Sequence, residues 1–195
     1  MTAPPKPGTR ALGVAESYRG RDDEGAESVL GGAVVRADRV VDGAALGRCR
    51  VGGLDATEAV ATLVADLGRE DARYCFLAGV APAWFNVVDL HALAEAVARP
   101  VLAVSFESSQ GLEAAIREAF DGEACERRLE SYRRLPPRRP VETDGDTLYV
   151  RSVGVEDDRA AALVRAYTVA GRPEPLRVAR LFARAGRAFA PSPTE

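Results

Sequence analysis

The sequence has few of the residues that bind transition metals. Its 195 residues include one histidine, His91, and three cysteines, Cys49, Cys75 and Cys125. The cysteines are widely spaced and form no Cys-x-x-Cys pair, so the sequence offers none of the common cysteine- and histidine-based zinc sites. A Ser-His-Asp mechanism would have to use His91, which lies within a segment of helical pattern and is interpreted as a structural residue.

The sequence also lacks long apolar segments. No apolar run reaches the roughly 18 residues that a membrane-spanning helix requires. Residues 1–10 are rich in proline and lack the apolar core of a signal peptide. Cys49 and Cys75 lie in apolar, strand-like runs and are expected to be buried free thiols. We therefore expect a cytoplasmic protein with no membrane partner.

Lysine is almost absent, and arginine carries the positive charge of a mildly acidic chain. Lys6 is the only lysine, so 25 of the 26 basic residues are arginine, while the net charge is −3. This balance argues against a generally basic protein that coats nucleic acid. Hydrophobic residues make up 47% of the chain, which is enough for a core, and the length fits one domain.

The hydrophobic pattern predicts the element order of an α/β domain. Strands are expected at residues 9–14, 28–36, 39–51, 73–80, 101–106 and 147–153. Helices are expected after an Asp55–Glu58 capping box, from Asn86 to Ala98, and at 109–120, 157–170 and 174–189. Three antiparallel strands followed by alternating helices and strands indicate a mixed sheet with helices on both faces. This order is compatible with a ribonuclease H-like fold.

The remaining segments define the expected domain boundaries. One domain is predicted over residues 9–189, between flexible tails at 1–8 and 190–195. Residues 16–27 are charged and contain glycine, which indicates a loop. Residues 121–146 are rich in arginine and interrupted by proline, which indicates a short helix followed by a loop.

Five short fragments, spread over residues 10–185, resemble a known family when they are taken together. They are ALGV at 11–14, GLDATE at 53–58, WFNVVD at 84–89, RPV at 99–101 and PEPLRVA at 173–179. In this order they resemble the uncharacterised archaeal proteins described as endonuclease V-like. The resemblance implies a ribonuclease H-like core. Endonuclease V itself uses magnesium to cleave nucleic acid near deaminated bases.

The chain departs from the family pattern where the resemblance implies metal-binding carboxylates. The family has aspartate at three positions that are Ala15, Gly52 and Ala78 here, and it tends to have histidine at the position of Arg180. Magnesium requires oxygen ligands, and two-metal cleavage needs several carboxylates. The departures therefore imply a degenerate site that binds no metal cofactor.

Three nearby carboxylates are weak candidates for a shifted catalytic site: Glu16, Asp55 and Asp89. Glu16 lies one position after Ala15 and would point to the other face of a regular strand. Asp55 is expected to cap a helix. Asp89 is expected in the first turn of the helix that follows Asn86, where negative charge favours the helix dipole. The structural interpretations are favoured, and the functional one stays open.

Two groups of arginines point to a nucleic-acid partner. An arginine stripe recurs at spacings of 3, 4 and 3 in the last helix and consists of Arg177, Arg180, Arg184 and Arg187. The opposite face of that helix is expected to be apolar, with Val178, Phe182, Ala185 and Phe189. An arginine cluster consists of Arg127, Arg128, Arg133, Arg134, Arg138 and Arg139. Both groups could bind a phosphate backbone, or they could be solvated surfaces.

The leading hypothesis is an endonuclease V-like protein that is catalytically degenerate and binds nucleic acid. One alternative is an active magnesium-dependent endonuclease that uses the shifted carboxylates Glu16, Asp55 and Asp89. The other is a non-enzymatic protein-interaction subunit. The sequence does not indicate a substrate, a protein partner or a physiological process.

Overall fold

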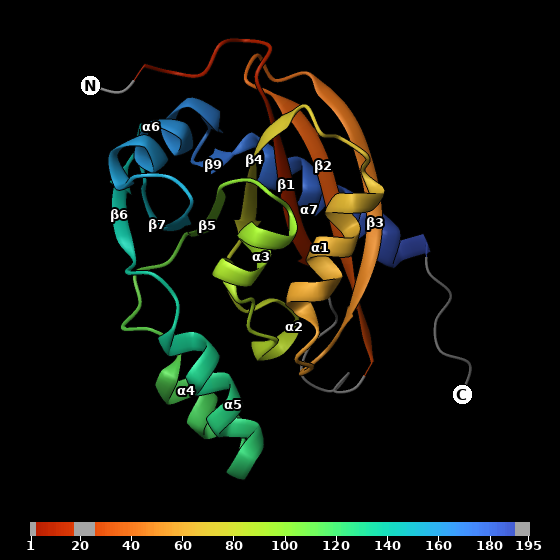
Figure 1. Ribbon diagram of the computed structural model, residues 1–195, viewed down its shortest axis with the longest axis vertical. Helices are drawn as coiled ribbons and strands as arrows, with labels where there is room; N and C mark the ends of the chain where they lie inside the picture. The colour runs from red at the N-terminus through yellow and green to blue at the C-terminus, as the bar shows by residue number, and fades with distance from the viewer. Residues whose placement is uncertain (1–2, 18–25, 190–195) are drawn as a thin grey trace.

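A seven-stranded mixed sheet forms the centre of the computed structural model, which describes residues 3–17 and 26–189 (Figure 1). The strand order is β3-β2-β1-β4-β5-β7-β6. β1 is parallel to β4, which is parallel to β5, and the other neighbours are antiparallel. The strands are β1 (Arg10–Ser17), β2 (Glu27–Arg36), β3 (Val41–Arg50), β4 (Ala72–Ala78), β5 (Val101–Ser105), β6 (Arg139–Glu142) and β7 (Thr147–Val153).

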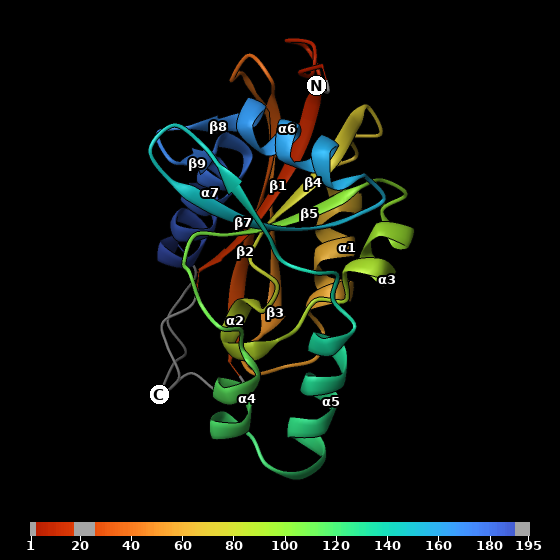
Figure 2. The ribbon, with the colours of Figure 1, turned by 90° about the vertical axis from the view of Figure 1, so that its left-hand side faces the viewer.

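Helices cover both faces of this sheet, as expected from the sequence (Figures 1 and 2). One face carries α1 (Ala56–Asp66) and α3 (Leu90–Ala96), and the other carries α6 (Asp157–Tyr167) and α7 (Glu174–Phe189). A short turn, α2 (Pro82–Phe85), precedes α3. None of the helices within the described ranges is long and apolar enough to cross a membrane.

The remaining elements lie at the ends of the sheet. A helical hairpin of α4 (Glu113–Ala119) and α5 (Gly122–Arg133) projects from one end. A small ribbon of β8 (Thr168–Val169) and β9 (Arg172–Pro173) connects α6 to α7.

Residues of the central strands are buried on alternate faces. In β1, Leu12 and Val14 belong to the core beneath α1 and α3, while Ala11 packs with α6 and α7. In β4, Leu77 belongs to the first core and Phe76 to the second. A strand that is covered on both faces is apolar along its whole length, which is why these strands are continuous apolar runs in the sequence.

Glycines in the sheet bring α7 unusually close to β1 and β2. A Cβ atom at Gly13 would lie 2.1 Å from the Pro175 carbonyl oxygen, and one at Gly31 would lie 2.2 Å from that of Ala179. The face of α7 that packs on these glycines therefore carries small side chains, including those of the buried residues Ala179 and Ala183.

This packing corrects the predicted apolar face of α7. Val178 is buried, but Ala185 is exposed and Phe189 is 92% exposed. Phe182 is partly buried against the same cluster as Val178, so the expected face is confirmed in the first half of the helix and wrong in the second. The glycines of the sheet determine which side of α7 makes contact there, and Ala183 is buried instead.

Several predicted boundaries also change. The loop expected at 16–27 is shorter, because Glu16 and Ser17 continue β1 and Glu27 begins β2. Residues 18–25, like 1–2 and the predicted tail at 190–195, lie outside the described residues. The segment 121–146 contains the whole of α5 and also β6. The helix expected from Asn86 begins only at Leu90.

Candidate functional site

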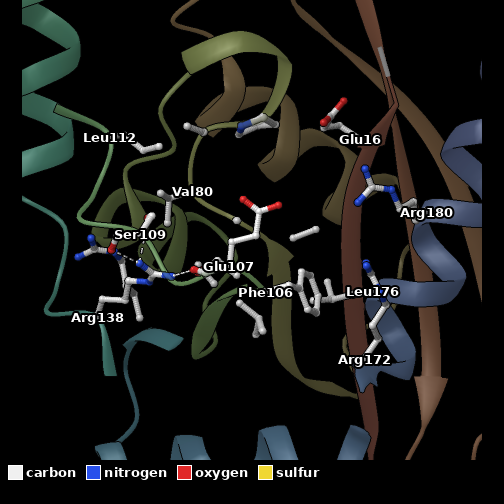
Figure 3. Close-up of a pocket in the computed structure, with 18 of the residues that line it drawn as sticks. Glu16, Val80, Phe106, Glu107, Ser109, Leu112, Arg138, Arg172, Leu176 and Arg180 are labelled. Carbon is white, nitrogen blue, oxygen red and sulfur yellow. Dashed lines mark hydrogen bonds between the residues drawn. The ribbon is translucent and has the colours of Figure 1, made fainter. Parts of the chain in front are cut away.

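A cleft of about 770 Å³ opens at the carboxyl ends of β1, β4 and β5 (Figure 3). Its floor is formed by residues 78–82, which follow β4, and by residues 103–106 at the end of β5. In α/β sheets, ligands bind outside the carboxyl ends of parallel strands, where the direction of the chain connections changes. Such a point lies between β1 and β4, because the strand order runs β3-β2-β1 on one side of it and β4-β5 on the other.

The charged groups of this cleft are mainly arginines. Figure 3 shows Arg138 on one side, Arg172 and Arg180 on the other, and Glu107 between them. The two carboxylates among the described lining residues are Glu16 and Glu107. The arginines that line the cleft come from α7, β9, β7 and the segment before β6, and they are Arg138, Arg151, Arg172, Arg177, Arg180 and Arg184.

Internal contacts hold three of these arginines. Arg177 forms a 2.6 Å ion pair with Glu174 in the first turn of α7. Arg151 Nη2 donates a 3.2 Å hydrogen bond to the Tyr132 hydroxyl. Arg138 donates to the Ser109 carbonyl oxygen at 3.0 Å, and its guanidinium also lies over an aromatic ring. These three side chains have fixed positions at the cleft.

The other three arginines are less constrained. Arg180 is half-buried and Arg184 is exposed, and neither forms an ion pair within 4 Å of a carboxylate in the described part of the chain. The guanidinium of Arg172 lies 4.4 Å from the centre of the Phe106 ring. Their N–H donors can therefore turn toward an anion in the cleft.

Glu16 lies at the end of β1, beside the arginine stripe. It is half-buried, and its carboxylate accepts a 3.4 Å hydrogen bond from the Ser28 hydroxyl. Burial raises the pKa of Glu16, and the positive charges of Arg180 and Arg187 oppose that increase. The carboxylate thus acts as a local counter-charge to two arginines of α7.

Asp55 occupies a different place, at the start of α1. Its carboxylate accepts hydrogen bonds from the Asn86 amide at 2.6 Å and from the Arg50 N–H at 3.2 Å, and it makes no cap hydrogen bond to α1. Asn86 caps the helix instead, because its Oδ1 accepts from Ala56 N–H at 2.9 Å. The predicted capping box of Asp55 and Glu58 is wrong, since a side chain from a distant segment takes over this function.

Asp89 caps α3. Its Oδ1 accepts hydrogen bonds from the backbone N–H groups of His91 and Ala92, at 3.0 and 3.1 Å. The prediction that Asp89 lies inside the first turn is wrong, because α3 begins at Leu90 rather than after Asn86. His91 is exposed on this helix.

The shifted-carboxylate site would require Glu16, Asp55 and Asp89 to converge. Of these, only Glu16 lines the cleft. The part of the chain that the structure describes contains no group of three or more histidine, cysteine, aspartate or glutamate residues able to hold a metal ion. Two carboxylates among six arginines do not fit a magnesium site, which needs several oxygen ligands.

Two of the three non-acidic positions lie together, because Ala78 packs against the cluster that contains Ala15. Ala78 lines the cleft, while Ala15 is buried and packs with Val178 of α7. Gly52 lies in the turn between β3 and α1, and its carbonyl oxygen accepts a hydrogen bond from buried Arg128.

Most of the arginine cluster supports the structure around α5. Arg133 pairs with Glu113 at 2.7 Å, and Arg134 lies 3.5 Å from both Asp89 and Glu130. Of the cluster, Arg138 lines the cleft. The sequence analysis did not single out Arg151 and Arg172, because each is an isolated arginine on its own strand and has no local spacing signal.

Comparison with known proteins identifies the family. The endonuclease dU family matches residues 7–186. A UPF0215 protein of Pyrobaculum aerophilum is 34% identical over 181 residues, which cover 91% of this chain and 94% of the relative. A UPF0215 protein of Methanopyrus kandleri is 31% identical over 182 residues, with 91% of each chain covered.

Solved structures show the same fold. A protein of unknown function from Archaeoglobus fulgidus has a TM-score of 0.78 and 26% identity, covering 91% of this chain and 97% of its own. Endonuclease V of Ciona intestinalis, in complex with an inosine-containing DNA, has a TM-score of 0.64 and 13% identity. The match covers 92% of this chain and 86% of the Ciona chain. These likenesses confirm the resemblance and the expected endonuclease V-like, ribonuclease H-like fold. The chain belongs to the endonuclease dU family.

Proposed function

We propose that the cleft of this protein binds the phosphate backbone of a nucleic acid, and that the protein does not cleave the nucleic acid by metal catalysis. The observation that supports the proposal is the charge of the cleft, where six arginines accompany Glu16 and Glu107. Nucleic acid carries a dense row of negative charge, and arginines that neutralise it release condensed counterions. The local charge of the cleft favours this ligand although the whole chain is mildly acidic.

The position of the arginines fits a backbone that runs across the cleft. Figure 3 shows Arg180 of α7 on one side of the cleft and Arg138 on the other. Arg184 also belongs to α7 and lines the cleft. The planar guanidinium offers paired N–H donors that match phosphate oxygens. Arg177 and Arg187 belong to the same stripe on α7, whereas Arg133 and Arg134 pair with carboxylates around α5 and would contribute less.

The same charge distribution argues against hydrolysis by bound magnesium. A magnesium ion would meet Glu16, whose carboxylate already compensates Arg180, and the exposed Glu107. The resemblance described above places the family's carboxylates at Ala15, Gly52 and Ala78, which provide no side-chain oxygen. The cleft therefore keeps groups that bind phosphate and lacks the set of oxygen ligands that the hydrolytic reaction requires.

A second candidate is an active endonuclease. The description of the family as endonuclease dU favours it, and so does the presence of both Glu16 and Glu107 in one cleft. This candidate requires metal-dependent cleavage that depends on at least one of these carboxylates.

The binding test uses the full chain and a fluorescein-labelled single-stranded oligonucleotide of about 20 nucleotides with one deoxyuridine. Fluorescence anisotropy should show saturable binding that weakens as the salt concentration rises. The double variant Arg180→Gln/Arg184→Gln should weaken binding about 10- to 100-fold, since two charge-assisted phosphate contacts are lost. The matched control is Lys6→Gln/Arg73→Gln, which removes two exposed charges near the amino ends of β1 and β4. Equal affinities for both double variants would overturn the proposal.

The cleavage test incubates the same oligonucleotide with the full chain and magnesium or manganese. The whole chain is used so that every carboxylate is present, including those outside the described residues. No metal-dependent product is expected. Cleavage that disappears in Glu16→Gln or Glu107→Gln would establish the second candidate instead.

A further inference from the structure

The two edges of the seven-stranded sheet differ in how they are protected. β6 forms one edge, has four residues, includes Pro140, and exposes the charged side chains of Arg139 and Glu142. Short length, proline and charge are the usual ways in which natural edge strands avoid pairing with another chain. β3 forms the other edge, has ten residues and no proline, and is uncharged from Gly43 to Gly47. The Asp42 carbonyl oxygen accepts a hydrogen bond from Arg69, and the Arg50 N–H donates to the Asp55 carboxylate. The outer N–H and C=O groups open to a further strand are therefore those between these two residues.

Apolar side chains accompany this open edge. Val41 and Leu46 are 45% and 53% exposed. Figure 1 shows that the end of α7 emerges beyond β3. Gly186 of α7 lies against Leu46, and the helix ends in Phe189, which is 92% exposed. A strand added to β3 would therefore find an apolar cover above it as well as hydrogen-bonding partners beside it.

We propose that β3 pairs with β3 of a second copy of this chain, in antiparallel orientation around Ala45, so that two sheets join into one. The sequence Asp42–Arg48 (DGAALGR) is complementary to itself in this register. Pairing around Ala45 places Gly43 opposite Gly47, Ala44 opposite Leu46, and Asp42 opposite Arg48.

The charges at the two ends of the strand favour this orientation. Asp42 lies near the beginning of β3, and Arg48 and Arg50 lie at its end. Within each chain, Asp42 already pairs with Arg10 and Arg69, and Arg48 pairs with Glu27. The charges therefore act by avoiding repulsion: antiparallel pairing places unlike charges opposite one another, whereas parallel pairing in register would bring like charges together, which destabilises a strand pair. No residue of β3 lines the cleft, so the dimer leaves the cleft open.

Sedimentation velocity over about a hundredfold range of protein concentration tests the dimer, because association follows mass action. The expected species at high concentration has twice the 20.7 kDa mass of the chain. Leu46→Arg should raise the dimer dissociation constant at least about tenfold, by placing a charge in the new core. The control Leu54→Arg changes a leucine of similar exposure in the turn after β3 and should dimerise normally. Thermal unfolding of both variants verifies that they are folded.

Cross-linking tests the register. The three native cysteines are buried, so a cysteine introduced at Ala45 is the reactive one. Under oxidation, Ala45→Cys should form a disulfide-linked dimer, because residues directly opposite in antiparallel strands lie within the Cα distance that a disulfide spans. The control Ala65→Cys, on the exposed face of α1, should not form a disulfide-linked dimer. A chain that stays monomeric at every concentration, or a dimer that Leu46→Arg leaves intact, would overturn the proposal.

Discussion

The side-chain amide of Asn86 donates a 2.6 Å hydrogen bond to the carboxylate of Asp55. This contact joins the GLDATE segment at 53–58 to the WFNVVD segment at 84–89, two of the motifs on which the resemblance rests. Asn86 also donates to the Arg50 carbonyl oxygen at 2.9 Å and is fully buried. Residues 79–82, which line the cleft, lie in the same loop as Asn86. These motif residues therefore hold the loop that forms the cleft floor.

Replacement of Asn86 should destabilise the fold. Asn86→Ala removes three hydrogen bonds and leaves the buried N–H of Ala56 without its partner, which should cost about 2–5 kcal/mol. Urea denaturation measures the loss. His91→Ala, an exposed change on the neighbouring helix, should have almost no effect. Equal stability of the two variants would contradict the structural role of Asn86.

The contact of α7 with the sheet should depend on glycine in β2. In Gly31→Ala, the new Cβ would lie 2.2 Å from the Ala179 carbonyl oxygen, so the helix must move. We expect a loss of at least about 1–3 kcal/mol of unfolding free energy, measured by thermal or urea unfolding. Gly8→Ala serves as the control, since no described atom lies within 4 Å of its Cβ. An unchanged stability in Gly31→Ala would disprove the close approach.

The salt dependence of binding should report how many phosphates the stripe contacts. For single strands, each neutralised phosphate contributes about 0.7 to the slope of log affinity against log salt. Arg180→Gln/Arg184→Gln should therefore reduce the magnitude of the slope by about 1.4. Anisotropy titrations between about 50 and 200 mM salt measure it. The Lys6→Gln/Arg73→Gln variant should keep the wild-type slope, and a parallel shift of both variants would show that α7 contacts no phosphate.

Glu16 should weaken binding at neutral pH because its negative charge lies beside Arg180 and Arg187. Glu16→Gln removes that charge and should raise the affinity for the oligonucleotide about fivefold, the effect of about 1 kcal/mol of repulsion. Wild-type binding should strengthen as the pH falls through the raised pKa of Glu16, while binding by Glu16→Gln should change less. Affinities of both proteins measured across this range provide the comparison, and a weaker Glu16→Gln complex at neutral pH would contradict the prediction.

The same carboxylate should make stability depend on pH. Burial raises the pKa of Glu16 above the ordinary value of 4.5, so the protonated form is favoured in the fold. The protonated Glu16 side chain stabilises the fold fully below the pKa that Glu16 has in the unfolded chain. This stabilisation is lost as the pH rises through the higher pKa that Glu16 has in the folded protein. Glu16→Gln should therefore be more stable than the wild type at neutral pH, and the difference should vanish toward pH 4. Glu107→Gln, an exposed change, should show no such dependence in the same denaturation series.

Local patterns predicted most strands and the starts of α1, α6 and α7 well, but they misplaced the start of α3. The runs at 28–36 and 101–106 match β2 and β5 closely, because burial on both faces makes a strand apolar throughout. The start of α3 was misplaced by three residues, because Asp89 rather than Asn86 caps this helix. Asn86 has the side chain of a capping residue, but it caps α1, thirty residues earlier in the chain. A local motif does not show that a capping group will serve a distant helix.

By itself, the sequence determined the α/β class, the family and the spacing that places four arginines on one side of the last helix. These features follow from local periodicity and from short motifs, which depend on neighbouring residues. Only the tertiary structure decided that three of those arginines share a cleft with Arg138, Arg151 and Arg172, and that Asp55 and Asp89 are used for structural contacts elsewhere. The physical reason is that the cleft is assembled where separate strands end, so its charge depends on chain crossings and on the glycine-mediated packing of α7, which no local pattern contains.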